Sequence, residues 1–192
     1  MIRRLYDWTL ARAASPRAMP ILGGVSFVEA SVFPIPPDVL MIPMILARPR
    51  RAWAIAGVAL LGSVLGALLG YFIGAALWDS VGRPVLEFYG KGDHFDEFRL
   101  RYNDYGAWAV LIAGVTPFPF KVITILSGAT GLSLPIFILS SILARAARFY
   151  LVAALLWRFG EPVREFVERW LGLLFAVFCV LLIGSFWLVR YL

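Results

Sequence analysis

The chain has 192 residues, of which 61% are hydrophobic and 16% are charged, and its mean hydropathy is +0.82. A soluble domain of this length cannot bury so much apolar surface, so the soluble globular class is excluded and an integral membrane protein is predicted. The net charge of +6 does not indicate a nucleic-acid partner. The arginines cluster at the ends of apolar runs, where anionic lipid headgroups lie.

The composition also excludes several kinds of site. His94 is the only histidine and Cys179 the only cysteine. There is therefore no zinc site, no disulfide framework and no chemistry that requires two histidines. We expect no metal and no cofactor.

Residues 1–18 are basic but are not a signal peptide. Their apolar residues are interrupted by Asp7, Arg12 and Arg17, so no continuous hydrophobic core forms. We expect this segment to be retained as an interfacial helix.

Residues 19–47 are long enough to span a membrane, but prolines interrupt them. Three of the prolines lie within four positions: Pro34, Pro36 and Pro37. Proline removes a backbone donor and clashes with the preceding turn, so a helix should end near Phe33. A second helix can restart at Asp38, which could cap its first turn. Each half is too short to cross about 30 Å of hydrocarbon, so a re-entrant hairpin is predicted.

Residues 52–78 form the first uninterrupted transmembrane span of the sequence. Its glycines recur every four positions and make one smooth ridge: Gly62, Gly66, Gly70 and Gly74. Such a ridge indicates close packing of a partner helix. The ridge and the final span are also the candidate surfaces for a homodimer, which the sequence leaves open. Residues 79–105 are polar and are predicted to lie outside the membrane, on the extracytoplasmic side.

Residues 107–131 repeat the earlier theme, with Pro117 and Pro119 followed by Lys121. A second re-entrant hairpin is predicted there. A transmembrane span at 133–157, a cytoplasmic connector at 158–170 and a last span at 171–190 complete the chain, which is treated as one membrane domain, 1–192.

The two Pro-x-Pro motifs begin 83 residues apart, and each is followed by one full span. The chain crosses the membrane once between them, so the second copy should be inverted, as in many transporters. The excess of basic residues favours a cytoplasmic N-terminus. Ten basic residues then lie inside and five outside: Arg3, Arg4, Arg12, Arg17, Arg48, Arg50, Arg51, Arg158, Arg164 and Arg169, against Arg83, Lys91, Arg99, Arg101 and Arg190.

Five ionisable residues lie within apolar segments: Glu29, Asp38, Lys121, Arg145 and Arg148. Arg145 follows Pro135 by ten residues, which places it roughly 15 Å along a helix and close to the bilayer centre. Charges at this depth indicate function by default, although they could serve only to hold the helices together. The three bases exceed the two acids by one, which favours an anion such as a phosphate headgroup. Burial favours the neutral form of a carboxylic acid, so either acid could carry a coupled proton.

Several of these features together resemble the DedA family, also called the SNARE-associated or VTT-domain family. They are Glu29 with Phe33-Pro34-Ile35-Pro36-Pro37-Asp38, the glycine ridge ending at Tyr71, and the segment from Pro117 to Gly128. The resemblance covers residues 20 to 157 and is nearest to the shorter YqaA-like branch. It implies that Glu29 and Asp38 match the family's essential acidic pair. Lys121, Arg145 and Arg148 depart from the Phe-x-Pro-x-x-Arg pattern of many members, which leaves the substrate open.

The resemblance implies transport of a membrane lipid, since bacterial members are taken to recycle undecaprenyl phosphate or to move phosphatidylethanolamine with a proton or sodium gradient. Eukaryotic relatives scramble phospholipids. We therefore expect a flippase for a phosphate-bearing lipid in the bacterial inner membrane. The alternatives are an ion-coupled transporter of a small soluble substrate and a nonenzymatic scaffold or insertion factor. An intramembrane enzyme is disfavoured because the chain has no Ser/His or metal constellation.

Overall fold

The computed structural model of the protein describes residues 17–33, 36–84, 92–116 and 118–189, and these form helices and short connections without a strand. Side chains are described as far as position 162, except those of residues 81, 92–94, 96 and 161. The interfacial helix predicted at 1–18 lies almost entirely outside these residues, as do Pro34 and Pro117. The same is true of the side chains of the span predicted at 171–190.

Two helices of the described part are long and apolar enough to cross a membrane, and they contain α4 (Ala52–Leu77) and the first part of α8 (Leu134–Val189). At 1.5 Å per residue, α4 is about 39 Å long, which exceeds the roughly 30 Å of a bilayer core. Their outward faces are rows of exposed leucines four residues apart, such as Leu61 and Leu65 on α4 and Leu139 and Leu143 on α8. Exposed apolar faces of this length indicate contact with lipid.

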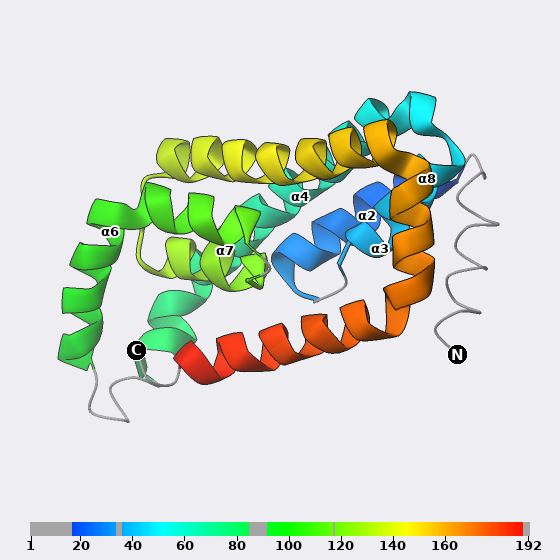
Figure 1. The fold of residues 1–192 in the computed structure, drawn as a ribbon. Coiled ribbons are helices and arrows are strands. Elements are labelled where there is room, and N and C mark those ends of the chain that lie inside the picture. Colours follow the sequence, from blue (N-terminus) through cyan, green and yellow to red (C-terminus); the bar gives the residue numbers. More distant parts are fainter. Residues whose placement is uncertain (1–16, 34–35, 85–91, 117, 190–192) are drawn as a thin grey trace.

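The two long helices cross in opposite directions. Trp53 of α4 contacts Trp157 of α8, and Tyr71 near the other end of α4 contacts Phe137. Beyond Phe159, whose φ of −124° and ψ of 30° are not helical, α8 changes direction (Figure 1). The helix continues through the predicted connector and final span, so no gap separates them in the backbone.

Both Pro-x-Pro motifs interrupt the helices, as predicted. Helix α2 (Ala18–Ser31) ends before the first motif and α3 (Asp38–Ala47) begins after it. Helix α6 (Gly92–Val115) ends before the second, and α7 (Phe120–Ala129) follows it. Helices α2, α3 and α7 have 14, 10 and 10 residues. At 1.5 Å per residue each is shorter than the hydrocarbon core.

The helices pack into two groups around the long ones. Helices α2 and α7 lie against α4, and we call these three the first bundle; α3 and α6 lie against α8, and we call these the second bundle (Figure 1). Each broken pair of helices is therefore divided, because α2 and α3 belong to different bundles, and so do α6 and α7. The chain therefore passes from one bundle to the other at each break.

The glycine ridge of α4 is the seam of the first bundle. A side chain at Gly62 or Gly66 would meet the backbone of α2 at Gly23 or Phe27, and one at Gly74 would meet the backbone of α7 at Ile125. The ridge is thus occupied within the chain, as close packing requires. Our suggestion that the ridge could serve as a dimer surface is wrong, because α2 and α7 already cover it.

Two further sequence expectations need correction. No boundary separates the polar segment 79–105 from the apolar approach at 107, because α6 runs without interruption from Gly92 to Val115. The segment contains no proline and no glycine between Asp93 and Tyr105, so nothing stops the helix there. A five-residue π-helix, η2 (Trp78–Gly82), ends the α4 rod.

Asp38 also does not cap α3. Pro37 occupies the N-cap position, no side chain caps the helix, and Asp38 is in its first turn. A carboxylate there still complements the positive end of the helix dipole.

Candidate functional site: charges at the helix breaks

Arg145 is a fully buried cation at the crossing of the two long helices, with a side-chain exposure of 1%. Its Nε donates to Ser63 Oγ of α4 at 2.7 Å, and its guanidinium pairs with the Glu29 carboxylate of α2. The guanidinium carbon also lies 4.9 Å and 4.7 Å from the ring centroids of Phe120 and Phe149. Arg145 of the second bundle therefore reaches into the first and contacts all three of its helices.

A burial this deep limits what Arg145 can do. Its contacts are a carboxylate, a hydroxyl and two aromatic faces, which together satisfy a guanidinium away from water. No exposed surface is left for a ligand. The geometry gives Arg145 the task of holding Glu29 and the two bundles in place.

Arg148 lies one turn further along α8 and forms the second ion pair. Its Nη2 donates to Asp38 Oδ2 at 2.7 Å, and its Nη1 donates to the backbone oxygen of Thr116 at 3.2 Å. The exposed fractions of the two side chains are 21% and 20%, so this pair is accessible from outside whereas Arg145 is not. Thr116 directly follows α6, so Arg148 connects the first turn of α3 to the carbonyl end of α6.

Lys121 forms the matching contact in the first bundle, between the start of α7 and the end of α2. Its Nζ donates to the backbone oxygen of Val32, the C-cap residue of α2, at 3.1 Å. Thr124 Oγ1, also on α7, donates to Ala30 O at 3.1 Å. A cation at the carbonyl end of a helix is favoured by the helix dipole. Lys121 forms no ion pair among the described residues, so it carries the excess positive charge of the group.

All five predicted charges thus lie at or next to the helix breaks. The pairing of Glu29 with Arg145 and of Asp38 with Arg148 could not be read from the sequence, because the two partners of each pair are more than 100 residues apart in the chain. Of the predicted turn prolines, Pro36, Pro37 and Pro119 lie in the connections between helices.

The sequence analysis missed several contributors to the site. Ser63 could have been noticed, because it is the only serine in the span 52–78. Nothing in the sequence marks the backbone oxygens of Val32 and Thr116 as acceptors, apart from a proline two residues after Val32 and one residue after Thr116. No group of three or more metal-ligating side chains occurs in the described part of the chain.

The family model of the VTT domain matches residues 30–158, which include four of the five charges and both long helices up to the kink. An uncharacterised protein of Haemophilus influenzae is 34% identical over 168 residues, which is 85% of this chain and 87% of the relative. A second uncharacterised protein, from Histophilus somni, is 33% identical over 168 residues, which is again 85% of this chain and 87% of the relative. No solved structure matches the chain. The protein therefore belongs to the VTT-domain, or DedA, family of membrane proteins.

Proposed function

We propose that the protein translocates a phosphate-bearing lipid, such as undecaprenyl phosphate or a phospholipid, across the bacterial inner membrane. The N-terminus is cytoplasmic in this proposal. The observation that carries it is the set of two acid–arginine pairs and one additional lysine at two helix breaks, within a chain that exposes apolar faces. Charges and broken helices at membrane depth are the features of a transport pathway. The proposal contains no covalent step.

The order of contacts supports an inverted repeat of re-entrant hairpins. Helix α2 packs on α4 as α6 packs on α8, and α7 packs on α4 as α3 packs on α8. The equivalent long helices α4 and α8 are antiparallel. A two-fold relation between the halves, with its axis in the membrane plane, accounts for both observations.

Exposure separates the groups that meet the substrate from those that position them. Arg148, Asp38 and Lys121 are partly exposed, so in our proposal the phosphate oxygens bind Arg148 and Lys121. Arginine suits a bidentate contact and lysine a point contact. Glu29 and Arg145 act as positioning residues behind them.

In this proposal, Asp38 is the proton-coupling group. A proton on Asp38 removes its negative charge and leaves the Arg148 guanidinium without its carboxylate. A phosphate can then replace the carboxylate at Arg148 with little change in the charge of the site. Loss of the proton restores the ion pair and favours release of the lipid.

The test is lipid translocation in proteoliposomes with and without an imposed pH gradient. A fluorescent phospholipid and undecaprenyl phosphate serve as substrates, and Asp38→Asn and Lys121→Met are compared with the exposed control Arg101→Gln. We expect gradient-stimulated translocation to fall at least tenfold in Asp38→Asn and substantially in Lys121→Met, while Arg101→Gln retains it. Lys121→Arg should retain activity if only the charge matters.

Full activity of Asp38→Asn would contradict the coupling step. Absence of lipid movement together with uptake of inorganic phosphate would favour the alternative, an ion-coupled transporter of a small soluble substrate.

A further inference from the structure

A half-open pocket of about 320 Å³ lies at the elbow of α8, away from the charges at the helix breaks. We call it the elbow pocket. It is lined by Leu46 at the end of α3, Pro49 of the short helix η1 (Pro49–Arg51) and residues 156–160 of α8. The non-helical backbone at Phe159 turns α8 away and leaves this space beside η1. We propose that the elbow pocket binds one anionic glycerophospholipid from the surrounding leaflet, distinct from the lipid that is translocated.

The charge around the pocket favours an anion. Arg158 lines it, and Arg50 and Arg51 directly follow the lining residue Pro49. Among the described side chains, no acidic residue lines it. The described acids are either paired at the breaks or lie toward the other end of α4, near Arg83, Arg99 and Arg101: Glu29, Asp38, Asp79, Glu97 and Asp104. The arginines of the elbow thus complement a phosphodiester.

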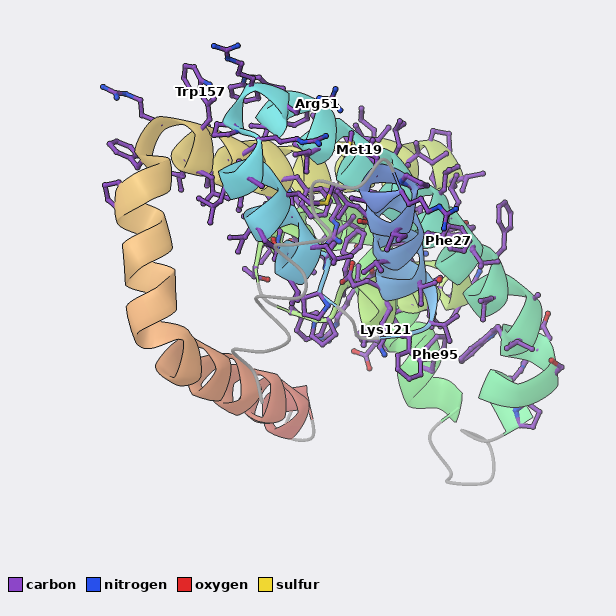
Figure 2. All side chains as sticks on the ribbon, turned by 90° about the vertical axis from the view of Figure 1, so that its right-hand side faces the viewer. Met19, Phe27, Arg51, Phe95, Lys121 and Trp157 are labelled. Atoms are coloured by element: carbon purple, nitrogen blue, oxygen red, sulfur yellow. The ribbon has the colours of Figure 1, made fainter. Side chains whose placement is uncertain are left out.

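Aromatic side chains place the pocket at the level of the headgroups. Trp157 is 52% exposed, and it packs against Trp53, which is 45% exposed, with ring centroids 6.1 Å apart. Figure 2 shows Trp157 and Arg51 at the same end of the molecule, and Phe95 toward the opposite end. Exposed tryptophans beside arginines are typical of a membrane–water interface.

The apolar part of the pocket suits an acyl chain. Leu46 and Leu156 line it, and the exposed Leu151 and Leu155 lie on the same face of α8 as the lining residue Phe159, toward the centre of the span. A lipid can therefore place its phosphate near Arg51 and Arg158 and its tail along α8. A soluble anion would use only the charged part, and this distinguishes a lipid from free phosphate.

The test is native mass spectrometry of the full chain released from nanodiscs that contain mostly phosphatidylcholine with a small fraction of phosphatidylglycerol. We expect one retained phosphatidylglycerol per chain. Each arginine near a membrane surface contributes about fivefold in lipid affinity, so Arg51→Gln/Arg158→Gln should reduce retention about 25-fold. The matched control Arg83→Gln/Arg101→Gln removes two arginines at the opposite end and should leave it unchanged.

A second variant separates the pocket from its charge. A Cβ on Gly160 would lie 3.7 Å from Leu46 Cδ2, so Gly160→Leu fits the backbone and fills the space without changing any arginine. It should also release the lipid. Unchanged retention in Gly160→Leu or in Arg51→Gln/Arg158→Gln overturns the proposal, as does an equal loss in the control pair. Lys121→Met should keep the elbow lipid, so a failure of the translocation proposal is distinguishable from a failure of this one.

Discussion

The two bundles are held together by different means. In the first bundle, helix backbones touch directly, because Gly66 and Gly74 of α4 lie against the backbones of α2 and α7, and Gly128 of α7 lies against α4. In the second bundle, Gly114 of α6 lies against Cβ of Ala144 of α8, whereas Gly106 of α6 faces the flexible side chain of Leu132 in the connection before α8. A backbone atom or an alanine Cβ cannot move aside as the end of a leucine side chain can, so added bulk should be tolerated less at Gly66 and Gly74 than at Gly106.

The bundles also differ in the contact by which each joins the helix ends at the two breaks. The first uses Lys121, which binds the end of α2 without any carboxylate. The second uses Arg148, which binds the end of α6 while paired with Asp38. Only the second contact contains a carboxylate, which is the group that the proposed proton coupling requires. In the proposed mechanism, charge-dependent movement therefore belongs to the second bundle.

The largest effect is expected at the one described ion pair that joins the bundles. Arg145→Ala leaves Glu29 buried without its partner, which should destabilise the protein by about 3–5 kcal/mol. Thermal unfolding of the detergent-purified protein measures this, and Glu29→Gln/Arg145→Met should recover most of the loss. An unaltered unfolding temperature in the single variant would mean that the bundles do not depend on this pair.

The glycine seam gives the sharpest contrast between the bundles. Gly66→Ala drives a methyl group into the Phe27 backbone and should cost about 2 kcal/mol. Gly106→Ala meets only the flexible end of Leu132 and should cost less than half as much. Gly24→Ala has nothing within 4 Å and should stabilise by up to about 1 kcal/mol through helix propensity. Equal losses at Gly66 and Gly106 in the same unfolding measurement would remove the distinction.

A smaller stability effect is expected at the Asp38–Arg148 pair of the second bundle. Asp38→Asn should cost roughly 1–2 kcal/mol, less than the Arg145 variant because the pair is partly exposed and screened by solvent. Cysteine accessibility reports the movement directly: labelling of Thr116→Cys should increase in the Asp38→Asn background. Labelling of Val32→Cys, at the Lys121 contact of the first bundle, should stay the same. A parallel increase at both positions would show that the contacts of the two bundles are not independent.

The smallest stability effect is expected at Lys121. Lys121→Met removes one hydrogen bond to Val32 O near the surface and should cost about 1 kcal/mol or less. Its effect on lipid translocation should exceed its effect on unfolding. A large loss of stability would instead assign Lys121 to the packing of the first bundle.

The sequence was sufficient to predict the long helices, both breaks and the five charges, because hydropathy, proline chemistry and buried ionisable residues are local signals. The continuity of α6 was missed because polarity was taken as a boundary, although nothing between Asp93 and Tyr105 ends a helix. The partners of Arg145 and Arg148 and the coverage of the glycine ridge depend on tertiary packing between distant segments. A single sequence does not contain that information in local form.

The position of Arg145 has a further consequence under the proposed two-fold relation. Shifting by the 83-residue spacing of the motifs, its counterpart is Gly62, the neighbour of the Ser63 hydroxyl that it contacts. A side chain that contacts the residue next to its own equivalent position lies close to the two-fold axis that relates the halves. Two arginines cannot share one axis, so only one half of the chain can supply this charge. Under this relation, the buried cation at the centre of the molecule comes from one half of the chain, and the equivalent position of the other half is a glycine.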